Sequence, residues 1–182
     1  SPKYGQFLIM ILLGCAFMGV FLAMESYRLE RLQIWRHPEN YEKGYQTLQG
    51  LYAIGSGGLF GNGLGNSIQK LGFVPEAQND MIFSIICEEL GLVGAAGILI
   101  LFLILIWRFF VIAAHAPDLE GTLIATGAMT HMMIQVILNI AVVTNTIPNT
   151  GITLPFISYG GTSVMFLLFE MGLVLNVSSL VK

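Results

Sequence analysis

The sequence predicts an all-α integral membrane protein with four transmembrane helices. Of its 182 residues, 55% are hydrophobic and 10% are charged, whereas about 25% of the residues of a soluble domain are charged. The mean hydropathy of +0.75 points the same way. A spanning helix needs about 20 mostly apolar residues, and the apolar stretches predict spans at about 6–25, 81–111, 120–143 and 161–179. A soluble helical bundle would need polar stripes at helical spacing, and 101–106 shows none.

The first predicted span, 6–25, lies very near the start of the chain. A secretory signal peptide would have a shorter apolar core and a cleavage site of small residues, whereas Gly-Val-Phe-Leu at 19–22 leads to a bulky, charged exit. We therefore expect a permanent helix. Because the chain starts Ser-Pro-Lys without an initiator Met, we also expect a processed protein or a fragment.

The connection between the first two spans, 26–80, is far longer than the roughly 12–15 residues beyond which loops are usually functional or disordered. With Glu25 it holds five of the eight Lys and Arg residues and six of the eleven acids. Its aromatic residues favour the membrane interface, so we expect an ordered interfacial domain. Within it, 45–54 has the spacing of a short amphipathic helix with Leu48, Leu51 and Tyr52 on one face.

Six glycines follow at positions 55, 57, 58, 61, 63 and 65. Neither the dinucleotide fingerprint nor the phosphate loop with its Gly-Lys-(Ser/Thr) is present. Tight turns with positive φ, where Gly is least costly, are the simplest interpretation. Backbone amides in such turns can also bind an anion.

The remaining spans follow from the apolar runs. The stretch 92–107 is short for a span, but an apolar run precedes it and only Glu88 and Glu89 interrupt, so one helix is predicted over 81–111. Two prolines and three glycines forbid a continuous helix over 148–161, which predicts a turn-rich connection between the last two spans.

Two carboxylates, Glu76 and Asp80, lie at the mouth of the second span. If the turn after Pro75 is helical, they are at i and i+4 and share a face. Asp at a helix start is also among the best N-caps, so a cap at Asn79 or Asp80 is expected whatever the function. A catalytic role and a capping role therefore both remain open from residue type alone.

Three motifs resemble one known family. Val-Pro-Glu-Ala-Gln-Asn-Asp-Met-Ile-Phe at 74–83, closing on Glu-Glu-Leu-Gly at 88–91, is similar to a signature of the FtsW/RodA/SpoVE enzymes of bacterial shape, elongation, division and sporulation. The segment 148–161, with Leu-Pro-Phe-Ile-Ser-Tyr-Gly-Gly, resembles a second signature, in which Asn149 stands where Val or another residue is common. The loop 61–70 resembles the family's approach to its active-site carboxylate. The resemblance implies that residues 1–182 are the C-terminal part of a single polytopic membrane domain of about ten helices.

The same resemblance implies a peptidoglycan glycosyltransferase that polymerises lipid II. The family's catalytic aspartate falls at Asp80, as a general base or as the ligand of a divalent cation, Mg²⁺ or Mn²⁺. A diphosphate leaving group needs positive charge, and Lys70 is the cation nearest in sequence to the site. The remaining substrate-binding candidates are Glu76, Gln69, Ser158, Tyr159 and Gly160.

The resemblance also implies partners and a location. We expect a class B penicillin-binding protein, divisome or elongasome proteins, membrane lipid and lipid II as partners, in the bacterial inner membrane. It places 26–80 outside the cytoplasm, although the positive-inside rule would place a loop that holds most of the Lys and Arg residues within. A net charge of −3 argues against nucleic acid, whose binding relies on Lys and Arg. Cys15 and Cys87 lie in apolar segments and predict no disulfide framework.

Four polar side chains inside the last two spans leave alternatives open. His131, Gln135 and Asn139 are spaced by four and share a face, and an acid such as Glu170 costs roughly 2.5–3.5 kcal/mol at the bilayer centre. A stripe of this kind more often joins helices than lines an ion path, and we expect Glu170 to find a partner in it. An ion path would favour a lipid II flippase or transporter, and a non-catalytic scaffold for the transpeptidase is a third hypothesis.

Overall fold

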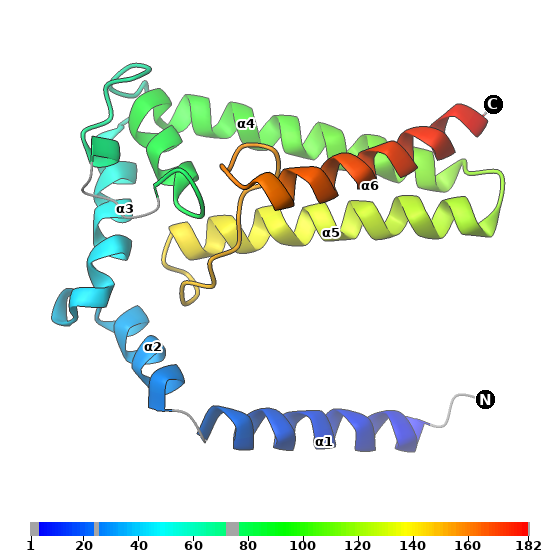
Figure 1. Cartoon of the computed structure of the whole chain (residues 1–182), viewed down its shortest axis with the longest axis horizontal. Helices are drawn as coiled ribbons and strands as arrows, with labels where there is room; N and C mark the ends of the chain where they lie inside the picture. Colours follow the sequence, from blue (N-terminus) through cyan, green and yellow to red (C-terminus); the bar gives the residue numbers. More distant parts are fainter. Residues whose placement is uncertain (1–3, 24–25, 72–76, 182) are drawn as a thin grey trace.

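The computed structural model describes residues 4–23, 26–71 and 77–181, and every regular element in those ranges is a helix. Three of the helices, α4 (Ile82–Ala114), α5 (Leu119–Val143) and α6 (Gly161–Leu180), run side by side (Figure 1). Each of the three is long and apolar enough to cross a membrane. Their bounds agree with the predicted spans 81–111, 120–143 and 161–179 to within three residues.

The first predicted span, 6–25, is also a helix, α1 (Tyr4–Ala23). It contacts the next helix, α2, and lies apart from α4–α6 in Figure 1. Side chains along it, including those of Phe7, Met10 and Phe17, are more than 60% exposed. That α1 crosses the membrane remains a prediction.

Over its described residues, 26–71 and 77–80, the long connection is ordered, as predicted, and contains several short helices. These are α2 (Ser26–Arg36), two 3₁₀ turns (Pro38–Asn40 and Glu42–Gly44), α3 (Tyr45–Ser56) and a third 3₁₀ turn (Gln69–Leu71). Helix α3 crosses the end of the bundle where α4 begins and packs against α4 (Figure 1). The helix predicted over 45–54 is thereby confirmed.

The buried face of α3 differs from the predicted one. Gly50 and Ala53 are buried, whereas Tyr52 is 58% exposed. A Cβ added at Gly50 would lie 2.3 Å from the Met81 methyl carbon. The small residues let the backbone of α3 approach the start of α4. The buried face of α3 is therefore the one that allows this close approach, and not the one with the larger side chains.

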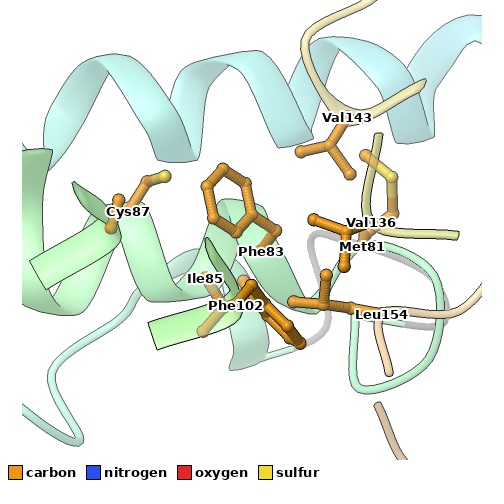
Figure 2. Close-up of a cluster of buried hydrophobic side chains, with 9 residues drawn as sticks. Met81, Phe83, Ile85, Cys87, Phe102, Val136, Val143 and Leu154 are labelled. Carbon is orange, nitrogen blue, oxygen red and sulfur yellow. The ribbon is translucent and has the colours of Figure 1, made fainter. Parts of the chain in front are cut away.

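A hydrophobic cluster lies where α3, α4, α5 and the connection 144–160 meet (Figure 2). Its largest side chains include Met81 and Phe83 from the start of α4, Phe102 from farther along α4, and Leu154 from the connection. Val136 and Val143, on α5, also belong to the cluster (Figure 2). Burial of such side chains contributes roughly 1.5–3 kcal/mol each where water is the alternative. The cluster therefore fixes the chain on both sides of Asp80.

Helix α4 covers the predicted span 81–111 but is interrupted at Gly91, a break that the sequence analysis did not predict. Gly91 has φ 67° and ψ −170°, a region essentially reserved for Gly. The break leaves backbone groups without partners in their own helix, and the glycine-rich loop supplies those partners. Asn62 N–H and Gly63 N–H donate to the carbonyls of Glu88 and Glu89, at 2.9 and 3.0 Å, while Leu92 N–H and Val93 N–H donate to the carbonyls of Gly58 and Leu59, at 3.0 and 3.1 Å.

The contact between this loop and the break leaves no room for side chains. A Cβ at Gly91 would lie 2.4 Å from the Gly61 nitrogen, and one at Gly61 would lie 2.2 Å from the Glu89 oxygen. Glycines 58, 61, 63 and 65 have positive φ, as predicted for tight turns, whereas Gly55 lies inside α3 and Gly57 has φ −70°. The loop and the break are therefore two halves of one backbone-to-backbone contact.

Candidate functional site

Asp80 lies in the turn before α4 and is 9% exposed. Helix α4 begins at Ile82 with Met81 at its N-cap, and no side chain caps it there. The cap expected at Asn79 or Asp80 is therefore wrong, because the helix starts later than that role requires. Asp80 Oδ1 instead accepts a hydrogen bond from Gln46 Nε2 of α3 at 3.4 Å.

Asp80 lines two hollows at this end of the bundle. The first, of about 310 Å³, we call the Arg31 hollow; it is lined by Arg31, Ile34, Trp35, Gln46, Thr47, Asp80, Asn145, Asn149, Thr150 and Gly151. The second, of about 330 Å³, we call the Tyr159 hollow; it is lined by Asn79, Asp80, Gly151, Thr153, Tyr159, Gly160, Thr162 and Ser163. Asp80 and Gly151 belong to both, so the carboxylate is placed where groups from either side could reach it.

The two signature motifs meet at Asp80 although about 70 residues separate them. Helix α4 runs away from this end and α5 returns, so the connection 144–160 lies beside the turn 77–81 (Figure 1). Tyr159 N–H donates to the Gln78 carbonyl at 2.8 Å. Asn139, at 0% exposure, donates from Nδ2 to the Asp80 carbonyl at 2.9 Å and to the Ile152 carbonyl at 2.8 Å.

Helix α2 closes the Arg31 hollow from the other side. Arg31 Nη1 donates to the Asn149 carbonyl at 3.1 Å. Trp35 Nε1 donates to the Asn145 carbonyl at 2.9 Å, and Asn145 Nδ2 donates back to the Trp35 carbonyl at 3.3 Å. Arg31 is the cation among the described residues that line either hollow, and it brings positive charge to the same hollow as Asp80.

The predicted substrate residues Lys70 and Gln69 lie in the third 3₁₀ turn, away from the linings of both hollows. Lys70 Nζ forms an ion pair with Glu89 Oε1 at 2.6 Å. Gln69 Oε1 is buried without a hydrogen-bond partner among the described residues. The Lys70 ammonium is therefore engaged by α4 in this structure.

Glu88 and Glu89 hold the loop that carries those two residues. Glu88, 2% exposed, accepts hydrogen bonds from the Ser67 hydroxyl and from Ile68 N–H, the latter at 3.1 Å. Glu89 Oε1 accepts one from Ser67 N–H at 3.4 Å. The anions bound by these loop amides are thus carboxylates of the same chain.

The predicted trio Ser158, Tyr159 and Gly160 divides into an internal and a surface part. Ser158 is 6% exposed, and its hydroxyl accepts a hydrogen bond from Leu154 N–H at 2.7 Å, closing the turn. Tyr159 is 77% exposed and lines the Tyr159 hollow together with Gly160, the N-cap of α6. Glu76, the other predicted carboxylate, lies outside the described residues.

One residue of the polar stripe of α5 joins two helices, as expected for the stripe. His131 Nδ1 lies 2.9 Å from a carboxylate oxygen of Glu170 on α6, so Glu170 has the predicted partner. Gln135 Oε1 is buried without a partner among the described residues. Asn139 links α5 to the backbone carbonyl of Asp80. This residue of the stripe therefore helps to hold the candidate site in place.

Sequence analysis missed Gln46 as a contact of Asp80 and set Asn149 aside. Gln46 occupies a polar position in the first turn of the predicted amphipathic helix, which was the available signal. Asn149 was noticed only as a departure from the family pattern. Trp35 and Asn145 carried no signal beyond the interfacial preference of aromatic residues.

The matching family model and the relatives with similar sequences point to the same family. The family model described as "Cell cycle protein", which covers FtsW, RodA and SpoVE, matches residues 2–182. The chain is 47% identical to stage V sporulation protein E of Bacillus subtilis over 181 residues, covering 98% of this chain and 49% of that protein. It is 43% identical over 166 residues to "Probable peptidoglycan glycosyltransferase FtsW" of Trichlorobacter lovleyi, covering 90% of this chain and 44% of that protein.

Two solved structures have a similar fold. One is described as "Structural coordination of polymerization and crosslinking by a peptidoglycan synthase complex"; it matches with a TM-score of 0.71 at 29% identity over 98% of this chain and 48% of that chain. The other, a mutant of the rod shape determining protein RodA of Thermus thermophilus, matches with a TM-score of 0.56 at 37% identity over 71% of this chain and 39% of that chain.

The chain spans about half the length of the curated relatives it matches. The family match nevertheless covers nearly all of its residues, and the two motifs that carry it meet at one buried carboxylate. This chain belongs to the FtsW/RodA/SpoVE family of cell cycle proteins.

Proposed function

We propose that this chain carries the Asp80 part of the active site of a peptidoglycan glycosyltransferase that polymerises lipid II. The observation that supports the proposal most directly is that one buried carboxylate lines two adjoining hollows. A reaction that joins two lipid-linked sugars needs a base between two substrate groups. The names of the FtsW relatives, as peptidoglycan glycosyltransferases, support the same reaction class.

In the proposed step, Asp80 accepts the proton of a sugar hydroxyl on the acceptor. The oxygen so activated attacks the anomeric carbon of the donor, and the bond from that carbon to the lipid diphosphate breaks. The diphosphate leaves with the bonding electrons and needs no proton, so one carboxylate suffices, unlike the pair that hydrolases of ordinary glycosides use. General base catalysis of this kind contributes typically 10²–10⁴-fold. Arg31, in the hollow shared with Asp80, provides positive charge for the diphosphate.

A divalent cation is part of the proposal. Among the described residues no group of three or more His, Cys, Asp and Glu side chains comes together to form a metal cage. A single carboxylate such as Asp80 does fit Mg²⁺, which is commonly held by one or two carboxylates together with substrate phosphates. When bound, the cation would neutralise charge on the diphosphate. Activity should then fall on addition of EDTA and return with Mg²⁺ or Mn²⁺.

We propose the bacterial inner membrane as the location and a class B penicillin-binding protein as the partner, within the divisome or elongasome. The three helices able to span a membrane and the family membership support a membrane enzyme. The solved relative described as a peptidoglycan synthase complex that coordinates polymerization and crosslinking supports a crosslinking partner.

The test is polymerisation of purified lipid II by the complete protein with its transpeptidase partner in detergent micelles. We expect long glycan strands from the wild type and a loss of at least 10²-fold for Asp80→Asn. Asp118→Asn is the matched control: Asp118 caps α5 at the far end by accepting from Gly121 N–H at 2.7 Å, and Asn caps as well as Asp. Its activity should equal that of the wild type.

The same assay separates the alternative functions. Micelles have no two sides, so a flippase makes no polymer in them, and a scaffold makes none without another polymerase. Wild-type activity in Asp80→Asn would overturn the assignment of the base. Absence of polymer from the wild type would overturn the enzymatic function.

A further inference from the structure

We infer that Gln46 is a positioning residue for Asp80, and that Asn149 determines which end of the Gln46 amide faces the carboxylate. The inference rests on the proposed function, in which Asp80 is the base. Gln46 lies on α3, 34 positions before Asp80 in the turn before α4 and 103 positions before Asn149 in the connection after α5, so the three residues come from separate segments.

The orientation of the Gln46 amide follows from a backbone N–H group, which can act only as a hydrogen-bond donor. Gly151 N–H can only donate, and it donates to Asn149 Oδ1 at 2.9 Å. The other end of the Asn149 amide is therefore the Nδ2 donor, and it lies 3.4 Å from Gln46 Oε1. Gln46 Oε1 is thereby committed as an acceptor, and the remaining end, Nε2, faces Asp80 Oδ1 at 3.4 Å.

The turn at 149–151 thus sets the polarity of a chain of hydrogen bonds that ends on the carboxylate. Amide groups in series have no choice of direction once one end is fixed, because an amide has donors at one end and acceptors at the other. A donor presented to Asp80 Oδ1 orients the carboxylate and suits its charged form. The reversed amide would place two acceptors face to face.

The position and the hydrogen-bond distances of Gln46 suit a side chain that positions Asp80 once substrate is bound. Gln46, Asn149 and Asp80 all line the Arg31 hollow, and the hydrogen bonds that join Gln46 to Asp80 and to Asn149, both 3.4 Å, are long. Such bonds commonly tighten only in the complex with substrate. Among the described residues that line the two hollows, Arg31 on α2 and Tyr159 before α6 are the other titratable side chains.

The main test compares kcat and KM for Gln46→Leu in the complete protein with its transpeptidase partner. Loss of a residue that orients a catalytic or metal-binding group typically costs 10–100-fold in activity, and we expect that loss in kcat with KM changed less than threefold. Gln49→Leu, one turn along the same half-buried helix, is the matched control and should leave both constants unchanged. A rise in KM with kcat unchanged would show that Gln46 contacts substrate and would overturn the inference.

Asn149→Asp tests the polarity. The new carboxylate still accepts from Gly151 N–H and keeps the turn, but it removes the donor to Gln46 and so allows the reversed amide. We expect a kcat loss as large as that of Gln46→Leu, and no further loss when Asn149→Asp is added to Gln46→Leu. Independent losses that multiply in the double variant would mean that Asn149→Asp acts through the negative charge it introduces and not through Gln46, and would overturn the role given to Asn149.

A measurement without turnover keeps the inference separate from the proposed function. In protein labelled with ¹⁵N-glutamine, the side-chain amide signal of Gln46 should shift in Asp80→Asn and in Asn149→Asp, whereas that of Gln49 should not. If the wild type makes no polymer but these shifts occur, the function is wrong and the hydrogen-bond chain stands. If the wild type polymerises and neither the shifts nor the kcat loss occurs, the positioning role is wrong and the function stands.

Discussion

The Asn139 side chain near the C-terminal end of α5 donates a 2.9 Å hydrogen bond to the backbone carbonyl of Asp80. The same amide group donates to Ile152 at 2.8 Å, so one fully buried residue holds together the turn before α4 and the connection after α5. The side chain of Asp80 and its main chain are thus held by different helices, α3 through Gln46 and α5 through Asn139.

Replacing Asn139 should therefore lower stability strongly. Asn139→Leu leaves two carbonyls without their donor, and each unsatisfied buried group costs about 1–3 kcal/mol. Gln135→Leu, one turn earlier on α5, is the control: Gln135 Oε1 already lacks a partner among the described residues, so its replacement should change stability little. Thermal unfolding in detergent measures both, and equal losses would contradict the special role of Asn139.

Gly91→Ala should destabilise the protein, whereas Gly97→Ala should not. Gly91 has a backbone conformation that costs other residues about 1–3 kcal/mol, and its Cβ would lie 2.4 Å from a backbone nitrogen. Around Gly97, also in α4, nothing lies within 4 Å of an added Cβ, and Ala is the better helix former by about 1 kcal/mol. The two unfolding temperatures should move in opposite directions, and a neutral Gly91→Ala would show that the break is not required.

Lys70 should contribute to loop stability more than to substrate affinity. Its ammonium lies 2.6 Å from Glu89, and the two side chains are 33% and 13% exposed. A partly exposed pair contributes about 0.5–1 kcal/mol, and Lys70→Met and Glu89→Gln should each lose that amount without adding in the double variant. A tenfold or larger rise in KM for lipid II with unchanged stability would instead support the predicted role of Lys70 in substrate binding.

Ser158→Ala and Tyr159→Phe should separate folding from binding. The Ser158 hydroxyl is the acceptor of the buried Leu154 N–H, so its loss should cost about 1–3 kcal/mol of stability. Tyr159 is exposed on the Tyr159 hollow, so its hydroxyl can be removed without loss of stability, and the effect should be confined to KM. Unfolding curves and steady-state kinetics on the same preparations distinguish the two.

The helices of the bundle were predictable because each has a local signal. Asp118 caps α5, and the prolines and glycines of 148–161 end one helix before the next begins. The break at Gly91 was not predictable from the sequence. A single Gly after Glu-Glu-Leu is compatible with a helix, and the break becomes evident only when the loop 57–63 lies beside it. The buried face of α3 was missed for a related reason: periodicity favours the large side chains, whereas the packing selects Gly50 for its lack of one.

The site was predictable in its centre and not in its surroundings. Asp80 carried a motif, and the structure places it, buried, at the lining of two hollows; its catalytic role stays a prediction. The contacts of Gln46, Asn149 and Arg31 depend on segments that meet only in the folded chain, and nearness in sequence to Asp80 pointed to Lys70 instead. The direction of each hydrogen bond depends on its neighbours in the folded network. It therefore does not follow from the type of any single residue.

The pairing of the glycine-rich loop with the break in α4 has a consequence for the order in which the protein is made. During synthesis the loop 57–63 leaves the ribosome before α4 does, so the partners of the interrupted helix exist before the interruption itself. Unpaired peptide groups cost several kcal/mol each in a lipid environment, and four are exposed at Gly91 until the loop docks. The hydrogen-bond partners of the interrupted helix are thus already made when α4 enters the membrane, and a circular permutation that placed 57–63 after α4 would remove that advantage while keeping the pairing between the loop and the break.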